Sequence, residues 1–279
     1  MANRSIELQT PKQKGTQTPK SDRLSKYNDP NNRNNYEVKT IEKAYLNQKT
    51  RADLISQVEI FKNMNCRYLY LVKHWEEDEI NLFLYTDSIS GVYLNVLMES
   101  HLLCSPGTHL AVRIKICRGL MYGLHYLHNQ DIVHGYICPQ HIIVKNLDEV
   151  AMFHNIGIQS CLDCHDQRKI RESAYTSPEV KDTFHLGRVF ELTKVSDIYS
   201  LGLVFYEIIT LKSALDWNSN GEQELKNVNH NLAFLLRRML QTDPEKRITA
   251  PEAFTLFSSS IHIDKSLPTD YPILPKRKY

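Results

Sequence analysis

Glycine is scarce in the first third of this chain of 279 residues, and none occurs between Gly15 and Gly91. That stretch therefore has no Gly-rich loop of the kind that lets a backbone approach phosphates closely. No apolar run approaches the roughly 20 residues needed to cross a bilayer, and residues 1–7 lack the apolar stretch of a secretory signal. We therefore expect a cytoplasmic or nuclear protein without a membrane partner. The formal net charge of +2 argues neither for nor against nucleic acid.

The six cysteines are expected to be free thiols, because the chain shows no signal for export to an oxidising compartment. They lie at positions 66, 104, 117, 138, 161 and 164. Cys161-Leu162-Asp163-Cys164-His165 has the form of a c-type haem attachment site. Haem attachment, metal binding by the two thiols with His165, and a loop with two incidental thiols are the alternatives. We favour the loop, because no second ligand pair stands at a suitable spacing.

The hydrophobic content of 42% is enough for a globular core, but the two ends of the chain lack apolar residues. Residues 1–35 are predicted to form a disordered basic tail, and residues 263–279 an extended C-terminal tail. The first tail contains Thr10-Pro11 and Thr18-Pro19. Both dipeptides resemble proline-directed phosphorylation sites, although a plain solvated tail is the favoured interpretation.

The patterning changes from strand-like to helical along the chain. Strands are predicted at 36–41, 68–72 and 81–85, with a helix at about 50–63, which together make a reduced β lobe. From about 108 onward, apolar residues follow the helical period. Residues 197–210 are apolar on nearly every side, which is typical of a buried helix. Thr249-Ala250-Pro251-Glu252 has capping-box spacing and predicts a late helix.

Residues 134–143, His-Gly-Tyr-Ile-Cys-Pro-Gln-His-Ile-Ile, resemble the catalytic loop of protein kinases, which reads His-Arg-Asp-Leu, three free positions and Asn. Four more elements follow in family order. They are Asn155-Ile156-Gly157 in place of Asp-Phe-Gly, Ser177-Pro178-Glu179 in place of Ala-Pro-Glu, the run at 196–202, and Asp243-Pro244-Glu245-Lys246-Arg247. The resemblance implies an α+β, two-lobed protein kinase-like fold over 36–262. Its β-rich N-lobe would span about 36–87 and its helical C-lobe about 92–262. The runs at 177–179 and 197–202 lean weakly towards tyrosine-kinase-like relatives.

The same alignment shows that the residues with catalytic roles in the family are replaced. Tyr136 stands at the position of the catalytic Asp, and its ordinary pKa of about 10 makes it a poor base at neutral pH. His141 and Asn155 stand at the two magnesium positions. Magnesium prefers hard oxygen ligands, so these degenerate positions predict no metal site. Gly135 and Cys138 replace an Arg and a Lys of the family loop.

Lys39, in Tyr36-Glu37-Val38-Lys39, is the best candidate for the lysine that contacts ATP in kinases. The position of its partner glutamate falls on Gln57, which cannot neutralise a lysine. Glu59 lies about 200° round the helix from Gln57 and is expected to point away. An ordinary strand lysine is therefore an equally good interpretation of Lys39.

Residues that build the large lobe of kinases are kept. The resemblance assigns structural roles to His134, Gly157, Glu179, Asp197 and Arg247. It implies that Asp197 accepts hydrogen bonds from the catalytic-loop backbone, and that Glu179 and Arg247 form a buried ion pair. Phe61, Ile156 and His134 would stand in a column that joins the lobes, with Asp197 at its base.

This selective loss predicts a pseudokinase, a protein without phosphoryl transfer that acts as a scaffold or allosteric regulator. It would be no enzyme and would need no cofactor, with ATP binding left open and magnesium not expected. Its partner would be a protein, either an active kinase or a signalling adaptor, and not nucleic acid. The alternatives are an atypical or weak kinase that binds ATP and phosphorylates protein Ser, Thr or Tyr, and a decaying kinase copy without a selected role.

Overall fold

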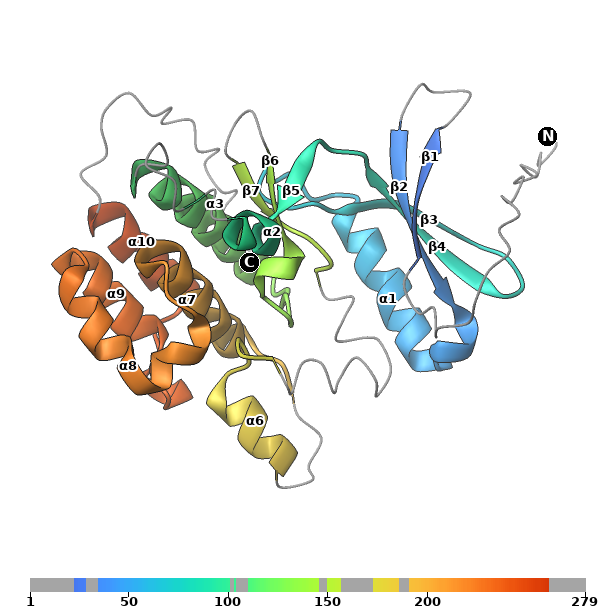
Figure 1. Ribbon diagram of the computed structural model, residues 1–279. Coiled ribbons are helices and arrows are strands. Elements are labelled where there is room, and N and C mark those ends of the chain that lie inside the picture. The colour runs from blue at the N-terminus through green and yellow to red at the C-terminus, as the bar shows by residue number, and fades with distance from the viewer. Residues whose placement is uncertain are drawn as a thin grey trace.

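The computed structural model describes residues 23–28, 35–100, 103, 110–145, 150–156, 173–185 and 191–260. A β-rich part precedes a mainly helical part along the chain, and the two lie side by side (Figure 1). The predictions on Thr10, Thr18, Gly157, the Cys161–His165 run and the tail at 263–279 lie outside the described residues. The predicted α+β architecture, a β-rich lobe followed by a helical lobe, is confirmed.

The small lobe is an antiparallel sheet in the order β1-β2-β4-β3. Its strands are β1 (Arg23–Asn28), β2 (Asn35–Glu42), β3 (Val72–Glu77) and β4 (Asn81–Asp87). Val38, Leu82, Leu84 and Tyr85 are buried along the two inner strands. Lys39 stands opposite Leu84 in the register of β2 against β4, so the two residues share a face of the sheet.

Two predictions about this lobe are corrected. Residues 23–28 were assigned to a disordered tail, but they form β1, which pairs with β2 from Arg23 opposite Thr40 to Asn28 opposite Asn35. Only two of the six residues of this strand are apolar, which is too few for the alternating pattern that predicts a strand from sequence. The strand is recognised instead from its pairing with β2. The strand expected at 68–72 begins instead at Val72, and Leu69 makes an isolated bridge to Phe153 in the other lobe.

Helix α1 (Gln48–Phe61) covers this sheet, close to the helix predicted from the apolar spacing. Asn47 begins it by accepting a hydrogen bond from the Thr50 amide at 2.8 Å. Leu54, Val58 and Phe61 are buried on one face. Leu54 and Val58 belong to the core cluster of the small lobe, whereas Phe61 belongs to the main core. The end of α1 thus points towards the boundary between the lobes.

A second, three-stranded sheet of order β5-β6-β7 lies where the lobes meet. It contains β5 (Gly91–Tyr93), β6 (Ile142–Lys145) and β7 (Val150–Phe153). Gly91 makes the close approach of β5 to β6, since a Cβ there would lie 2.6 Å from Ile143 Cγ2. The loop at 134–141 leads directly into β6, and Asn155 follows the end of β7 by two residues.

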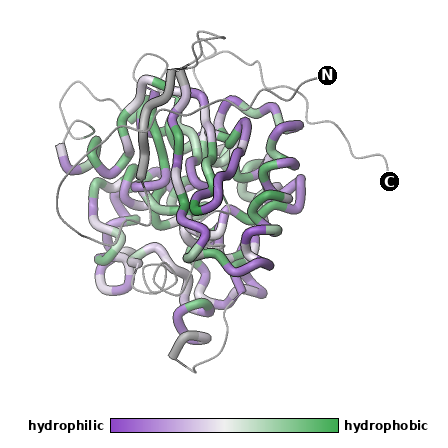
Figure 2. Tube along the Cα trace, turned by 90° about the vertical axis from the view of Figure 1, so that its right-hand side faces the viewer, coloured by the Kyte–Doolittle hydropathy of each residue, from purple (hydrophilic) through white to green (hydrophobic). Residues whose placement is uncertain are grey.

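The helical lobe packs around α7 (Lys194–Thr210), whose residues from Ser196 to Ile209 are buried with the exception of Ser200. The predicted burial of this helix is confirmed, and its apolar residues share one core cluster with those of the surrounding helices. Figure 2 shows the hydrophobic (green) and hydrophilic (purple) stretches alternating along the chain. The other helices are α2 (Leu94–Glu99), α3 (Leu110–Asn129), α6 (Pro178–His185), α8 (Trp217–Glu224), α9 (His230–Met239) and α10 (Ala250–Ser260). Short 3-10 turns are η1 (Lys43–Tyr45), η3 (Pro139–His141), η4 (Ala214–Asp216), η5 (Leu225–Asn227) and η6 (Pro244–Lys246).

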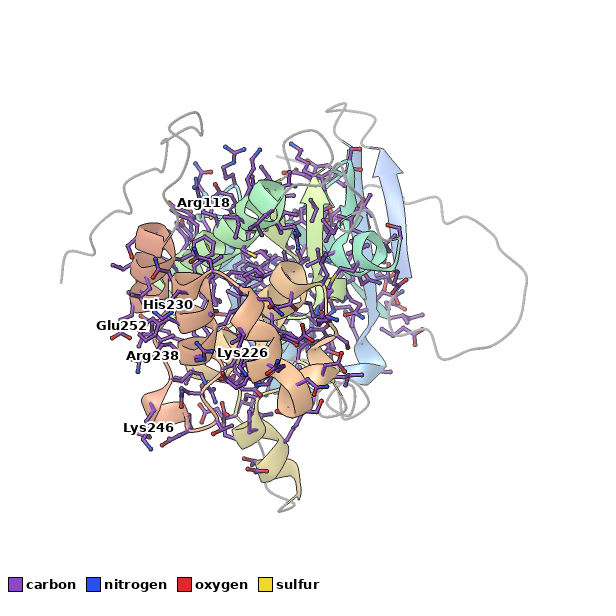
Figure 3. All side chains as sticks on the ribbon, turned by 60° about the vertical axis from the view of Figure 1, so that its left-hand side comes forward. Arg118, Lys226, His230, Arg238, Lys246 and Glu252 are labelled. Atoms are coloured by element: carbon purple, nitrogen blue, oxygen red, sulfur yellow. The ribbon has the colours of Figure 1, made fainter. Side chains whose placement is uncertain are left out.

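The outer face of the helical lobe carries charges of both signs. Figure 3 labels side chains from several elements there, among them Arg118, Arg238, Lys246 and Glu252. The predicted cap of α10 is present, because Glu252 accepts hydrogen bonds from the amide and hydroxyl of Thr249 at 2.9 and 2.7 Å. Among the described helices, none alone is long and apolar enough to cross a membrane. Only α7 together with residues 214–227 passes that test, as a pair bent by 107°.

Candidate active site

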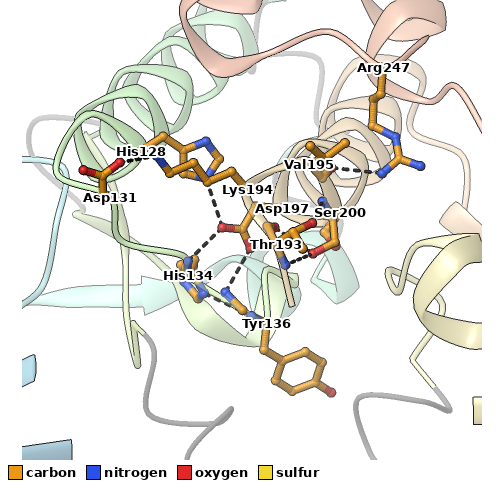
Figure 4. A network of polar contacts seen from close by, with 12 residues as sticks. His128, Asp131, His134, Tyr136, Thr193, Lys194, Val195, Asp197, Ser200 and Arg247 are labelled. Atoms are coloured by element: carbon orange, nitrogen blue, oxygen red, sulfur yellow. Dashed lines mark hydrogen bonds and ion pairs between the residues drawn. The ribbon is translucent and has the colours of Figure 1, made fainter. Parts of the chain in front are cut away.

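Asp197, in the first turn of α7, holds the loop at 134–136 by its backbone (Figure 4). Its carboxylate accepts hydrogen bonds from the amides of His134 and Gly135 at 2.8 and 2.9 Å, and from the His128 ring at 3.0 Å. Only 1% of Asp197 is exposed. A carboxylate near a helix N-terminus is also favoured by the helix dipole. Two of these three contacts go to backbone amides of the loop, so they fix it without using any side chain of the loop itself, and the third ties Asp197 to α3.

Gly135 has a backbone φ of 83°, in the left-handed region that favours glycine. From the sequence alone, Gly135 is only the replacement of an arginine. The structure shows that the loop also needs a residue that adopts a positive φ at this position. His134 beside it is fully buried, and its ring packs edge-to-face against Phe153 at 5.1 Å. Burial lowers the pKa of His134 to about 4, so the ring is neutral at physiological pH. It acts in packing, as the family resemblance implies.

Tyr136 and His141 lie together at the position of the missing catalytic pair. Their rings are 4.8 Å apart, and the Tyr136 ring points away from Asp197 (Figure 4). The His141 Nδ1–H donates to the Tyr136 carbonyl at 3.0 Å. In a neutral ring this leaves Nε2 as the nitrogen with a lone pair. An imidazole nitrogen is a possible proton acceptor near neutral pH, whereas the Tyr136 phenol is not.

Lys39 and Asn155 bring the two lobes into contact. The Lys39 ammonium donates to Asn155 Oδ1 at 3.5 Å, and only 8% of Lys39 is exposed. Asn155 has a φ of 57°, a left-handed conformation that asparagine tolerates better than most residues. The sequence prediction of Lys39 as a residue of the cleft therefore has a geometric basis, since an ordinary surface lysine would be exposed.

Helix α1, next to the strand of Lys39, carries Gln57 and Glu59. The Gln57 side-chain oxygen is buried and has no hydrogen-bond partner. Glu59 accepts from the Trp75 indole at 2.9 Å and from Lys62 at 2.7 Å on the exposed side of α1. Glu59 thus points away from the cleft, as expected from its place on the helix.

A small pocket lies around Lys39 and Asn155 where the two lobes meet. Its free volume is about 10 Å³, close to the smallest space that holds one water molecule. The pocket is lined by Lys39, Phe61, Tyr70, Leu71, Val72, Leu84, Thr86, His154, Asn155 and Ile156. Phe61 and Ile156, two expected members of the column joining the lobes, meet in this lining.

Three side chains of this region were missed by sequence reasoning: Glu37, Tyr70 and His154. Tyr70 donates to Glu37 at 3.0 Å and stacks obliquely on the His154 ring at 5.2 Å. Burial lowers the pKa of His154 to about 3, with His141 and Lys39 adding to the effect. No motif marks these positions. Glu37 lies within β2, whereas Tyr70 lies just before β3 and His154 just after β7.

Glu179 and Arg247 form the expected ion pair away from the cleft. The guanidinium donates to both carboxylate oxygens, at 2.6 and 2.8 Å, and the Arg247 side chain is 0% exposed. Burial alone would raise the pKa of Glu179, but the hydrogen bonds from Arg247 outweigh it and the pKa is lowered. The pair ties the start of α6 to the segment between η6 and α10.

The metal implied by the kinase fold does not match the donors at these positions. His141 and Asn155 offer an imidazole nitrogen and a neutral amide oxygen, whereas magnesium is usually bound by carboxylates and phosphates. The side chains at these two positions therefore do not fit a magnesium ion.

The arrangement of a β-rich lobe, a backbone-anchored loop and a cleft lysine defines a protein kinase-type fold. The chain belongs to the protein kinase domain family, whose model matches residues 23–256. It is 26% identical over 234 residues to the serine/threonine-protein kinase ULK3 of Xenopus laevis, covering 78% of this chain and 48% of that protein. It is 30% identical over 184 residues to a receptor-like protein kinase of Ipomoea nil, covering 62% and 16%. The chain thus spans about half of the first relative and less of the second.

The fold is also that of Rad53 residues 1–466, solved in complex with AMP-PNP. The TM-score is 0.63 at 19% identity, and the match covers 84% of this chain and 60% of that one. The prediction that this chain is not an enzyme is contradicted, because the family and the named relatives are protein kinases. The error arose from treating each replaced side chain as a lost activity. The resemblance to tyrosine-kinase-like relatives and the existence of a protein partner stay predictions.

Proposed function

We propose that this chain is an atypical protein kinase that binds ATP between its lobes and transfers the γ-phosphoryl group slowly to a protein Ser, Thr or Tyr hydroxyl. The observation that carries the proposal is the Lys39 ammonium, which reaches Asn155 Oδ1 across the cleft at 3.5 Å. The phosphates of ATP carry negative charge, and a lysine ammonium that stands in the cleft can pair with them through charge-assisted hydrogen bonds.

In this proposal Lys39 neutralises charge on the phosphates, and the loop at 134–136 positions the acceptor hydroxyl. The bond that forms joins the hydroxyl oxygen to the γ-phosphorus, and the bond that breaks joins that phosphorus to the bridging oxygen of ADP. The proton of the hydroxyl passes to His141 Nε2. Positioning and electrostatics provide most of kinase catalysis, so a site with a single cation is expected to be slow.

The test uses Lys39→Met and a matched control, Lys73→Met. Lys73 is a half-exposed lysine on β3, 3.8 Å from Asp87, outside the cleft lining. We expect ATP to raise the melting temperature of the wild type and of Lys73→Met but not of Lys39→Met. A bound ligand at 100 times its Kd stabilises the fold by about 2.7 kcal/mol.

Transfer is then measured with radiolabelled ATP, as autophosphorylation and on a mixture of histones. The label should be incorporated by the wild type and by Lys73→Met, and at least tenfold less by Lys39→Met. If Lys39→Met binds ATP and transfers phosphate like the wild type, Lys39 has no role in the site and the proposal fails.

A further inference from the structure

Tyr70 lines the pocket between the lobes, and its hydroxyl makes three polar contacts. It donates to Glu37 Oε2 at 3.0 Å and to the Asp87 carbonyl, and it accepts from the Thr86 hydroxyl at 3.0 Å. Asp87 ends β4, at the start of the segment that leads into the second sheet. The hydroxyl is therefore held at the backbone connection between the lobes.

The rest of Tyr70 is fixed from the helical side. Its amide donates to the Phe153 carbonyl at 2.8 Å, and its ring lies 5.2 Å from the His154 ring. Only 6% of Tyr70 is exposed. One residue thus joins β7 of the second sheet to β2 and β4 of the small lobe, and the contacts at its tip and at its base belong to different lobes.

Lys39 and Tyr70 both line the pocket and offer different chemistry. Lys39 offers a cation. The Tyr70 hydroxyl bonds to two acceptors next to the lining, the Glu37 carboxylate and the Asp87 carbonyl, which share its single proton. Glu37 and Lys39 lie two residues apart on the same face of β2, a separation of roughly 7 Å. An amino group on a heterocyclic base can donate to a carbonyl such as that of Asp87.

The free volume of the pocket is about 10 Å³, whereas pockets for small molecules usually measure about 300–1,000 Å³. A nucleotide therefore does not fit while the residues of the lining, Tyr70 among them, keep their places. Burial and the nearby Glu37 carboxylate raise the pKa of Tyr70, so its hydroxyl keeps the proton that it donates. A base that donates to the Asp87 carbonyl would have to replace the contact that Tyr70 makes there.

We propose that Tyr70 is a latch over the base-binding end of the pocket, and that ATP binds only when its hydroxyl leaves the Asp87 carbonyl. This rests on the proposed function, because it assumes that the pocket takes ATP. Releasing the latch also loosens the link between β7 and the small lobe. The residue therefore sets nucleotide affinity without contacting the phosphates.

The test compares Tyr70→Phe with a matched control, Tyr85→Phe. Both tyrosines are 6% exposed, and the Tyr85 hydroxyl also donates to a carboxylate, Glu76 at 3.0 Å, but Tyr85 does not line the pocket. Isothermal titration with ATP should show about tenfold tighter binding for Tyr70→Phe, equivalent to 1.4 kcal/mol. Binding by Tyr85→Phe should stay within about twofold of the wild type.

Two further measurements separate a local latch from a general loosening. Tyr70→Ala, which also removes the ring, should bind ATP at least as tightly as Tyr70→Phe; if it does not fold, Tyr70→Phe still decides. Inorganic triphosphate, which engages only the Lys39 end, should bind the wild type and Tyr70→Phe equally.

Each outcome of these measurements tests a different proposal. Equal ATP affinity in the wild type and Tyr70→Phe overturns the latch and leaves ATP binding intact. A parallel gain for triphosphate also overturns it, because the effect would then not be confined to the base end. Absence of ATP binding in every variant overturns both the latch and the proposed function.

Discussion

The ion pair between Glu179 and Arg247 allows a quantitative test of the large lobe. Besides the two bonds to Glu179, the guanidinium donates to the carbonyls of Val195, Gln241 and Thr242 at 3.0, 2.9 and 3.3 Å. All five contacts are made inside the protein, since the Arg247 side chain is 0% exposed. We therefore expect both Arg247→Ala and Glu179→Ala to destabilise the fold strongly.

The size follows from what each change leaves behind. Removing one partner of a buried pair costs about 3–5 kcal/mol, because the other charge stays desolvated and unpaired. Arg247→Ala also leaves three backbone carbonyls without this donor, whereas Glu179 is 26% exposed and can gain water. The larger loss is expected for Arg247→Ala. The double variant should be less destabilised than the sum of the two, by about 1.5–3 kcal/mol of coupling.

The measurement is urea unfolding of the wild type, both single variants and the double variant at pH 7. Arg237 and Glu222 form the control pair, 2.9 Å apart with side chains 36% and 67% exposed. A surface pair of this kind should give a coupling below about 1 kcal/mol. Strictly additive effects for Glu179 and Arg247 would refute the reasoning, since two groups that share a buried contact cannot act independently.

The same pair gives a dependence on pH. The pKa of Glu179 is lowered in the folded protein from an ordinary value of 4.5. The stabilisation it provides is therefore fully present above about pH 4.5 and is lost as the pH falls through the lower folded value. We expect the coupling in the double-mutant cycle to persist from pH 7 to pH 5 and to decline below about pH 4.5.

Three further predictions address the cleft and its support. Burial lowers the pKa of His154 from 6.5 to about 3, so as the pH falls the unfolded chain binds a proton at this residue before the folded protein does. The free energy of unfolding of the wild type should therefore fall by about 2 kcal/mol between pH 6.5 and pH 5. His154→Leu should reduce this dependence on pH, as measured by urea unfolding. Asp197→Asn removes the negative charge of the carboxylate that accepts hydrogen bonds from two loop amides. It should lower the free energy of unfolding by roughly 1.5–3 kcal/mol. Asn155→Asp supplies a carboxylate of the kind that magnesium prefers, so added magnesium should raise the transfer of radiolabelled phosphate by this variant at least tenfold, whereas it should not do so for Tyr136→Asp; an equal effect of magnesium on both variants would contradict this.

Much of the large lobe could be predicted because its signals are local and apolar. The all-round apolar character of residues 197–210 marks the buried α7, and the spacing of Thr249 and Glu252 marks the start of α10. These features depend on residues within one or two turns of each other. The small lobe was harder, since β1 has little apolar pattern of its own and exists through its pairing with β2.

The candidate site was only partly predictable for a related reason. Lys39, Asn155 and His141 occupy motif positions, so the alignment with kinases could find them. Tyr70 lies in a run of apolar and aromatic residues, where nothing distinguishes it from a core residue. Its place in the site depends on the start of β3, and the sequence pattern misplaced that strand. An error in one strand boundary was enough to hide a residue whose hydroxyl contacts Glu37 and Asp87.

The way in which the loop is anchored explains how the family fold tolerates such different residues at the catalytic positions. Asp197 contacts the backbone amides of His134 and Gly135, and Arg247 reaches backbone carbonyls as well as Glu179. Backbone groups are the same whatever side chain stands at position 136, so the loop keeps its path when the catalytic aspartate is replaced. The geometry of the large lobe and the chemistry of the cleft are therefore separable in this protein. Substitutions at the cleft change what the site can do without removing the contacts that hold the loop, which is why the absence of an aspartate at position 136 does not by itself decide whether the chain transfers phosphate.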